Sequence, residues 1–295
     1  MPMIVHLVDG TYELFRHFYG LRRFTKGSDR PLGAVVGVLQ TVLEMIEQGA
    51  THIGVATDHV IESFRNELWP GYKTSEGMPP ELLAQIPVME ASLIAAGFTV
   101  WPMVEHEADD ALGAAAAVAD ADPRVEQVLI ITPDKDLGQC VRGTRVVQYD
   151  RRKQEIIDRD GVVAKFGIPP ESIADYLGLV GDTADGFPGL SGWGAKSAAA
   201  VLARYGSLEE IPDNPALWDV PGLRGAAKLA ATLVEYRELA LLFRRIATVD
   251  VTVEVGAVDD WEWHGPTADF VTVAAELGTP GLANRAVGLA QRRVR

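Results

Sequence analysis

Two aspartates, Asp134 and Asp136, follow an apolar run that is typical of a buried strand. The run covers residues 128–131, and only Thr132 and Pro133 separate it from the first aspartate. Buried parallel strands have nearly continuous apolar sequences, and open α/β sheets bind ligands just beyond the carboxyl ends of their strands. Carboxylates in this place are candidate ligands for a metal ion.

Acidic residues follow three further apolar runs in the same way. These acids are Asp9, Asp58, Glu107, Asp109 and Asp110. If the strands are parallel neighbours, all of these side chains lie at one edge of a sheet. Crowded carboxylates raise one another's pKa, and bound cations remove that conflict. Oxygen ligands alone suit Mg²⁺ or Mn²⁺ rather than zinc. A single acid at a strand end is more often a turn or a helix cap, but four acidic strand ends favour metal binding.

A later pair, Asp182 and Asp185, is spaced three residues apart, so on a helical turn the two side chains share a face. With this pair the candidate metal ligands number nine among acids that give the chain a net charge of −14. Such a charge is unusual for a protein that binds nucleic acid. Setting the nine candidates aside removes most of it, and bound ions offset more, so the charge does not exclude DNA as a partner.

A glycine-punctuated turn follows this pair and leads into a predicted helix. Backbone N–H groups at a helix N-terminus bind phosphate, and glycines let the phosphate come close. No strand precedes the turn, which disfavours a dinucleotide-binding fold. A tight turn between two helices would explain the glycines equally well. The candidate phosphate-binding residues here are Gly189, Gly192, Gly194, Lys196 and Ser197.

The stretch at residues 64–80 is rich in proline and glycine but also carries aromatic and basic side chains. Its composition predicts a mobile segment over the acidic edge, with little apolar material to pack. An ordinary surface loop is the alternative. Exposed aromatics beside Arg or Lys suit stacking on bases and contact with phosphate. Arg65, Tyr72 and Lys73 are therefore candidate DNA-binding residues.

Length and composition agree with a large globular protein. A chain of 295 residues, of which 47% are hydrophobic, is long enough for two domains. No apolar run is long enough to span a membrane, and the first residues lead into a strand rather than a signal peptide. Cys140 is the only cysteine, which excludes an internal disulfide and favours the cytoplasm.

The remaining pattern predicts a largely helical second half. Thr11 is a candidate helix cap, and Arg22, Arg23, Lys26 and Arg30 form a basic loop that is either solvated or contacts phosphate. A weaker second hairpin is expected at residues 221–225, and no convincing internal repeat is seen. Further predicted elements are helices at 33–48, 81–96, 107 to about 119, 226–246 and about 267–277, a hairpin of 145–149 with 153–157, and a strand at 248–255.

In order along nearly its whole length, the chain resembles the bacterial 5′-nucleases. This is the 5′–3′ exonuclease and flap endonuclease group, which includes the N-terminal domain of DNA polymerase I. The resemblance rests on Leu7-Val8-Asp9-Gly10, Asp58 with Phe64-Arg65 and Tyr72-Lys73, Glu107-Ala108-Asp109-Asp110, Thr132-Pro133-Asp134-Lys135-Asp136-Leu137, and Gly181-Asp182 through Lys196-Ser197-Ala198. Each motif alone is weak, whereas five in the same order are specific.

The resemblance implies a structure-specific nuclease that uses two Mg²⁺ or Mn²⁺ ions on DNA with 5′ ends, flaps or gaps. One ion would be held mainly by Asp9, Asp58, Glu107, Asp109 and Asp134, and the other mainly by Asp136, Asp182 and Asp185, with Asp110 close by. Lys73 matches the lysine that touches the scissile phosphate, and it is expected to be catalytic together with Asp134 and Asp136. The glycine turn would grip duplex DNA and hold K⁺ through carbonyl oxygens.

The fold implied is a mostly parallel central sheet flanked by helices, a PIN-like 5′-nuclease core, with a helical DNA-binding subdomain. The expected division is a core at residues 1–160 with a short arch at about 64–96, a helical subdomain at 161–247 with a helix–three-turn–helix at about 181–205, and a C-terminal segment at 248–295 that packs back on the core. No polymerase region is present, so a stand-alone nuclease with a place in DNA replication and repair is expected.

Two departures from the family pattern stand out. No Arg follows Lys73 shortly, because that neighbourhood reads Thr74-Ser75-Glu76, and Gly186 stands where Asn is common. The first departure bears on how the arch handles phosphate, and the second on how firmly the second metal is held. Three alternatives remain: a catalytically weak DNA-binding protein of this fold, a ribonuclease of a related acidic fold, and a phosphohydrolase with no nucleic-acid substrate. Retention of all nine acids disfavours the first of these, and the glycine turn disfavours the other two.

Overall fold

The computed structural model describes residues 3–25 and 30–293 and divides the chain into two compact units. Unit 1 combines Met1–Ile61, Ser75–Thr132 and Val251–Arg295, and unit 2 combines Glu62–Thr74 and Pro133–Asp250. Of the predicted basic loop, Arg22 and Arg23 belong instead to the helix that covers Gly10–Thr25, and Lys26 lies outside the described residues. No described helix is long and apolar enough to cross a membrane.

Unit 1 is built on parallel strands in the order β3-β2-β1-β4. The strands are β1 (Met3–Asp9), β2 (His52–Asp58), β3 (Thr99–Met103) and β4 (Val125–Ile131). The helices are α1 (Gly10–Thr25), α2 (Gly33–Glu47), α4 (Pro80–Leu83), α5 (Gln85–Ala95), α6 (Ala108–Ala121), α12 (Phe270–Glu276) and α13 (Gly281–Arg293).

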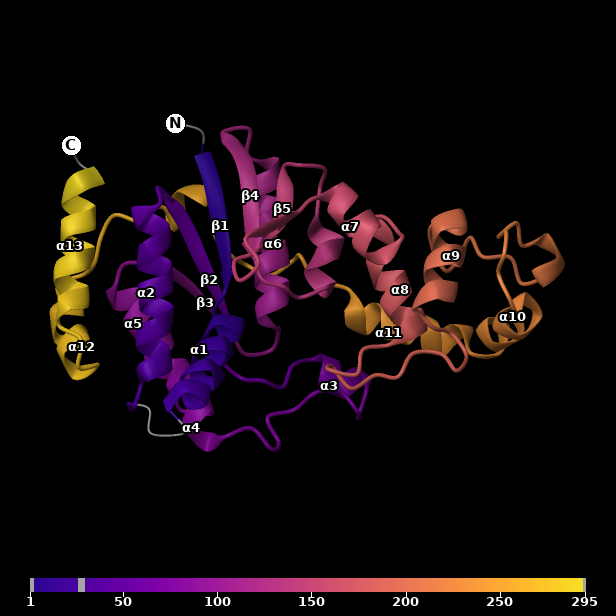
Figure 1. Ribbon diagram of the computed structural model, residues 1–295, viewed down its shortest axis with the longest axis horizontal. Helices are drawn as coiled ribbons and strands as arrows, with labels where there is room; N and C mark the ends of the chain where they lie inside the picture. Colours follow the sequence, from indigo (N-terminus) through magenta and orange to yellow (C-terminus); the bar gives the residue numbers. More distant parts are fainter. Residues whose placement is uncertain (1–2, 26–29, 294–295) are drawn as a thin grey trace. The chain divides into compact units, whose positions relative to one another are not determined.

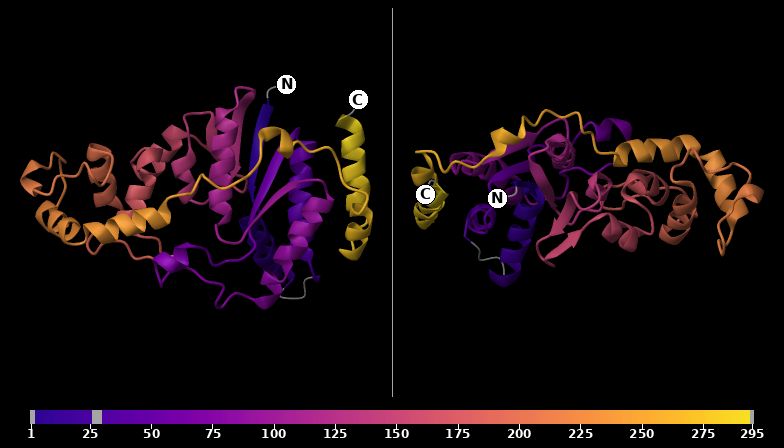
Figure 2. Two further views of the ribbon diagram at one scale, coloured as in Figure 1. Left: turned by 180° about the vertical axis from the view of Figure 1, so that it is seen from behind. Right: turned by 90° about the horizontal axis from the view of Figure 1, so that it is seen from above.

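The strand order reverses between β3 and β4, and this sets the layers of unit 1. Crossovers between parallel strands are right-handed, so a connection that runs back across the sheet passes over its other face. Accordingly α6 covers one face and α1 and α2 lie on the opposite one, as the views from front and behind show (Figures 1 and 2). The predicted mostly parallel sheet flanked by helices is confirmed.

The C-terminal segment completes the core of unit 1 through tryptophans. Trp101 lies over Gly54, where a Cβ would come within 2.0 Å of the ring, so only glycine leaves room for it. The indole N–H groups of Trp101 and Trp261 both donate to the carbonyl of Val255, at 3.1 and 2.8 Å, and the two rings meet edge to face. Trp263 donates to the carbonyl of Ala96 at 2.9 Å.

Unit 2 is mostly helical. Its elements are α3 (Arg65–Leu68), β5 (Val146–Asp150), β6 (Glu155–Ile157), α7 (Arg159–Phe166), α8 (Ile173–Val180), α9 (Ala195–Tyr205), α10 (Ala226–Glu235) and α11 (Arg237–Ala247). A short 3₁₀ helix covers Asp136–Cys140. Strands β5 and β6 form the predicted antiparallel hairpin. A core of buried aromatic and aliphatic side chains joins the helices, with Phe243 of α11 fully buried at its centre.

Four expectations about local structure are wrong. The predicted strand at 248–255 has no strand partner and runs as an irregular connection. The helix at 226–246 breaks at Tyr236, which has φ −116° and ψ 27°, into α10 and α11. The helix at 81–96 is likewise two helices, α4 and α5. Thr11 does not cap α1: Asp9 does so by accepting the N–H of Tyr12 at 2.8 Å, while Thr11 Oγ1 accepts the N–H of Asp58.

Candidate active site

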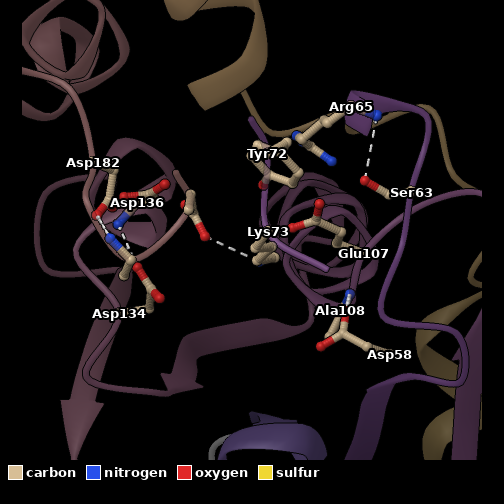
Figure 3. Close-up of polar contacts among 12 residues, drawn as sticks. Asp58, Ser63, Arg65, Tyr72, Lys73, Glu107, Ala108, Asp134, Asp136 and Asp182 are labelled. Carbon is tan, nitrogen blue, oxygen red and sulfur yellow. Dashed lines mark hydrogen bonds and ion pairs between the residues drawn. The ribbon is translucent and has the colours of Figure 1, made fainter. Parts of the chain in front are cut away.

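Three carboxylates of unit 2 come together although one of them is far in sequence from the other two. Oxygens of Asp136, Asp182 and Asp185 all lie within 4.8 Å of one another, a spacing at which they could hold one metal ion. Asp136 begins the 3₁₀ helix, while the other two lie in the turn after α8, closed by mutual backbone hydrogen bonds between Asp182 and Phe187. Figure 3 shows Asp136 and Asp182 converging from these two segments. We call this group the aspartate trio.

Asp136 is the member of the trio whose environment most calls for a cation. Its side chain is 7% exposed, and its Oδ1 is buried without a hydrogen-bond partner. Burial, together with the negative charges of Asp134 and Asp185, raises the pKa of the Asp136 carboxyl well above its usual value. A buried acceptor without a partner is costly, and a divalent ion would satisfy it while keeping the carboxylate ionised. The trio therefore fits a metal ion.

Two lysine side chains offset the negative charge of the aspartate trio. Lys135 Nζ donates a hydrogen bond to Asp182 Oδ2, and Lys73 Nζ lies 3.2 Å from Asp185 Oδ1. Burial lowers the pKa of Lys135, but its hydrogen bond to Asp182 and the surrounding carboxylates outweigh burial and raise it overall. The Lys135 ammonium group thus stays charged, and both lysine side chains lie beside the oxygens that a metal ion would use. No role was predicted for Lys135 from the sequence, although its position between Asp134 and Asp136 indicated that it lies near the candidate metal ligands.

The segment that carries Lys73 is packed rather than loose. Trp69 packs edge to face on Phe243 with ring centroids 5.0 Å apart, and its Nε1 donates to the carbonyl of Gly186 at 3.0 Å. The backbone N–H of Lys73 donates to the carbonyl of Asp185 at 2.9 Å. The expectation of an unpacked segment is therefore wrong for residues 69–73, because Trp69 and Tyr72 supply buried apolar surface.

Gly186 is required by this packing. It has φ of 82°, which favours glycine, and a Cβ at this position would lie 2.0 Å from the carbonyl oxygen of Gly71. The departure from the usual Asn is thus explained by the close approach of the segment that carries Lys73. Gly186 therefore positions that segment. From the sequence alone, glycine in place of Asn was linked only to a less firmly held second metal ion.

Two predicted DNA-contacting residues are buried in unit 2. Arg65 is 3% exposed, and its guanidinium donates to the carbonyls of Ile246 at 2.7 Å and Thr248 at 3.1 Å. Tyr72 is 4% exposed and belongs to the apolar core. Both side chains therefore hold the fold together, and neither presents its polar end on a surface where a phosphate could reach it.

The acids of unit 1 lie where the strand-end pattern predicts. Asp9 ends β1, and its Oδ2 accepts the hydroxyl of Thr132 at 2.9 Å. Asp58 ends β2, and its Oδ1 accepts the N–H of Ala108 at 2.8 Å, a bond drawn in Figure 3. Asp58 is thereby tied to the start of α6, which carries the remaining acids of this unit.

The first turn of α6 holds the Glu-Ala-Asp-Asp motif. The N–H of Glu107 donates to Asp110 Oδ2 at 3.0 Å, a capping arrangement that buries both acids, whereas Asp109 is half-buried. Acids in a first helical turn also complement the helix dipole. The cap gives one oxygen of Asp110 a backbone donor within the same helical turn, which lowers the cost of burying this carboxylate.

A buried carboxylate that the sequence did not single out holds the end of β2. Glu90 of α5 accepts the hydroxyl of Thr57 at 2.6 Å through Oε1, and its Oε2 lies 2.7 Å from His59 Nδ1. These two residues flank Asp58. His59 and Thr57 are thus both held by Glu90, and no sequence spacing pointed to Glu90.

The glycine turn lies at the start of α9, as predicted. Ser197 Oγ and the Gly194 backbone exchange hydrogen bonds that cap the helix. Gly189 packs against the chain at Gly181, whereas Gly194 and Lys196 are exposed. The residues predicted from the glycine pattern therefore divide into an inner part that closes the turn and an outer part on the surface.

Comparisons with known proteins agree with this architecture. Residues 4–167 match the family model described as the 5'-3' exonuclease, N-terminal resolvase-like domain, and residues 168–269 match the 5'-3' exonuclease, C-terminal SAM fold. Among solved structures, the T5 5'-exonuclease with bound divalent metal ions (zinc) superposes with a TM-score of 0.65 at 17% identity, covering 98% of both chains. The catalytic core of Rad2 in complex with DNA substrate gives 0.62 at 16% identity, covering 98% of this chain and 92% of the other. At this identity these structures show the shared fold.

Curated relatives are more similar in sequence. The DNA polymerase I of Pseudomonas aeruginosa is 36% identical over 269 residues, which covers 88% of this chain and 28% of the relative, so the chain spans less than a third of that protein. The 5'-3' exonuclease of Buchnera aphidicola subsp. Baizongia pistaciae is 32% identical over 253 residues, covering 84% of this chain and 82% of the relative. Together with the two family models, these matches show that the chain belongs to the 5'-3' exonuclease family.

Proposed function

We propose that this protein is a structure-specific 5′-nuclease that hydrolyses DNA phosphodiester bonds near 5′ ends, flaps or gaps with the help of divalent metal ions. The observation that carries the proposal is the aspartate trio with the unpartnered, buried Oδ1 of Asp136. Membership of the family supports the substrate class, and it supports work in DNA replication and repair.

Mg²⁺ or Mn²⁺ is the proposed ion, because the donor set consists of carboxylate oxygens. The unit 2 ligands would be Asp136, Asp182 and Asp185, with Asp134 adjacent. The unit 1 ligands would be Asp9, Asp58, Glu107, Asp109 and Asp110. When bound, such ions lower the pKa of water and offset charge on the leaving oxygen.

The chain's own groups would do the rest of the work. Asp134 Oδ1 accepts the N–H of Asp136 at 2.9 Å, which fixes the backbone of the 3₁₀ helix that presents Asp136. Lys73 is the catalytic cation of the proposal: its ammonium group would move from Asp185 to the scissile phosphate and stabilise negative charge there. The glycine turn with Lys196 and Ser197 would grip the duplex backbone through N–H groups, with K⁺ held by its carbonyl oxygens.

Cleavage of a 5′-labelled flap substrate tests the proposal. The wild type should cut in Mg²⁺ or Mn²⁺ and not in EDTA. Asp134→Asn should remove most cleavage while DNA binding survives, because metal ligands stabilise the transition state more than the ground state. Asp269→Asn, an exposed change of the same kind, serves as the control. Equal cleavage by Asp134→Asn and the wild type would refute the assignment.

A catalytically weak DNA-binding protein of the same fold is the second candidate. It predicts binding without metal-dependent cleavage in the same assay, so the flap experiment separates the two. We also propose a cytoplasmic location, which the single buried cysteine, Cys140, supports.

A further inference from the structure

A second turn in unit 2 repeats the sequence of the first. Residues 188–196 read Pro-Gly-Leu-Ser-Gly-Trp-Gly-Ala-Lys, and residues 221–228 read Pro-Gly-Leu-Arg-Gly-Ala-Ala-Lys. Each stretch runs into an alanine-rich helix, α9 after the first and α10 after the second, and the two helices lie at the same end of unit 2 (Figure 1). The expectation of no internal repeat is therefore wrong at this short scale.

The aligned glycines of the two turns adopt the same backbone conformation. Gly189 and Gly222 have φ of 69° and 76°, and Gly192 and Gly225 have φ of 83° and 74°. All four values lie in the left-handed region, which residues with a side chain rarely adopt. The likeness of the two turns thus extends from sequence to geometry.

Trp193 joins the two turns. Its Nε1 donates to the carbonyl of Leu229 in α10 at 3.3 Å, and its ring lies 6.2 Å from that of Trp218. The side chain is 6% exposed. The first turn is thereby fixed to the helix that follows the second, so the pair forms a preformed surface.

A cavity of about 610 Å³ lies between the turns. Its lining includes Lys196 and Arg224 but no acidic and no aromatic residue. Both cations are exposed, and neither forms an ion pair with any residue in the described part of the chain. In a protein with a net charge of −14, a cavity lined by two cations and no acid favours an anionic ligand.

Gly194 leaves the backbone beside the cavity open. It is the N-cap of α9, a position that favours glycine, and a Cβ built there meets no atom within 4 Å. Gly194 lines the cavity, and the next N–H groups, in the first turn of α9, have no intrahelical acceptor. Glycine leaves that backbone open to close approach from outside.

We propose that residues 221–228 are a second backbone-gripping turn, and that the cavity between the turns holds phosphates of duplex DNA. Arg224 and Lys228 each contact a phosphate opposite the first turn. Single strands are bound by stacking on aromatic side chains, which the cavity lacks, whereas phosphate contacts alone carry no base identity. The inference rests on the proposed action on DNA and specifies which part of the substrate is held here: the duplex beside the cleavage point, independent of sequence.

Duplex binding at several salt concentrations tests the second turn. In EDTA, where no cleavage is expected, Arg224→Ala and Lys228→Ala should each weaken binding of unrelated duplexes by a similar factor. Each should also lower the slope of log affinity against log salt by about 0.9 in magnitude, the value for one phosphate contact on B-DNA. Arg245→Ala removes the same charge from an exposed site on α11 and should leave the slope unchanged. Slopes equal to wild type in both variants, or an equal fall in the control, would overturn the proposal.

A variant that keeps every charge gives a second test. Gly194→Ala should still fold, because no atom lies within 4 Å of the added Cβ, with only the small loss of stability of a weaker N-cap. It should bind duplex several-fold more weakly, because its Cβ takes up space that the ligand uses. Gly288→Ala, another position with nothing within 4 Å of the Cβ, is the matched control. Normal duplex binding by Gly194→Ala would refute the ligand role of the cavity.

Flap cleavage by the wild type in Mg²⁺ is measured alongside. A wild type that binds duplex through these residues but never cleaves refutes the proposed function and leaves the second turn standing. A wild type that cleaves while Arg224→Ala, Lys228→Ala and Gly194→Ala all bind normally refutes the second turn alone.

Discussion

Gly186→Ala should destabilise unit 2 and displace Lys73, because Gly186 lies against the segment that carries this lysine. The new methyl group would stand 2.0 Å from the carbonyl oxygen of Gly71, well inside any real contact distance. A backbone oxygen cannot rotate away as a flexible side chain can. The segment at residues 69–73 must therefore move as a whole.

Two terms set the size of the effect. An alanine at φ 82° costs roughly 1–2 kcal/mol of backbone strain. Moving the segment also breaks the hydrogen bond of Trp69 Nε1 to Gly186 and that of the Lys73 N–H to Asp185, each worth about 1 kcal/mol. We therefore expect a loss of roughly 3–4 kcal/mol in the free energy of unfolding.

Gly192→Ala measures the first term alone, so the difference between the two variants gives the second. Gly192 has nearly the same φ, 83°, but a Cβ there meets nothing within 4 Å, so only the strain of roughly 1–2 kcal/mol remains. Urea unfolding of both variants measures the difference, expected at about 2 kcal/mol. Cleavage should fall in Gly186→Ala beyond the effect of stability, because Lys73 is no longer held beside the trio. Equal destabilisation by the two substitutions would refute the packing argument.

Three further outcomes are expected. Burial and the charges of Asp134 and Asp185 raise the pKa of Asp136. Between the ordinary pKa and the raised one, the folded state keeps a proton that the unfolded state releases. In EDTA the free energy of unfolding should therefore fall as the pH rises through this range. Asp136→Asn should therefore have a larger free energy of unfolding than the wild type in EDTA at mildly alkaline pH, by up to about 1.4 kcal/mol for each pKa unit of the shift. The difference should close in acid, and the variant should lose stabilisation by Mn²⁺. A variant no more stable than the wild type contradicts this. Lys73→Ala should lower single-turnover cleavage by roughly 10²-fold with a smaller effect on DNA affinity. It should also tighten Mn²⁺ binding, because Asp185 loses the ammonium group beside it. Normal cleavage by this variant would show that Lys73 is not catalytic. Glu76→Arg restores the cation expected near the arch lysine and should tighten binding of 5′ ends in a titration, so an unchanged affinity counts against steering by this segment.

The acids at the strand ends were predictable because their signal is local. Asp9 and Asp58 directly follow apolar runs, and parallel strands place such ends at one edge whatever the details of packing. The aspartate trio was predictable only through the family resemblance, since Asp136 and Asp182 are brought together by the path of the chain between them.

Residues whose partners are remote in sequence could not be placed. Arg65 looked like a phosphate contact, but its acceptors are carbonyls at Ile246 and Thr248, some 180 residues away. Residues 248–255 have the β-branched composition of a strand, yet they pair with no strand in the described part of the chain. Val255 instead provides the carbonyl that two indole N–H groups share. Composition indicates which secondary structure a segment favours, but the hydrogen-bond partners that the fold provides determine which structure it adopts.

The order in which the chain contributes segments to the two units affects how the protein can fold during translation. Unit 1 draws its residues from three separate stretches, the last of which begins at Val251 and supplies Trp261 and Trp263 to its core. A polypeptide leaves the ribosome from its N-terminus and domains fold as their parts emerge. Unit 2 is complete by Asp250, so it is the first part of the molecule able to close during translation. The strands of unit 1 are made earliest, and the face around Trp101 stays uncovered until Trp261 and Trp263 have been synthesised.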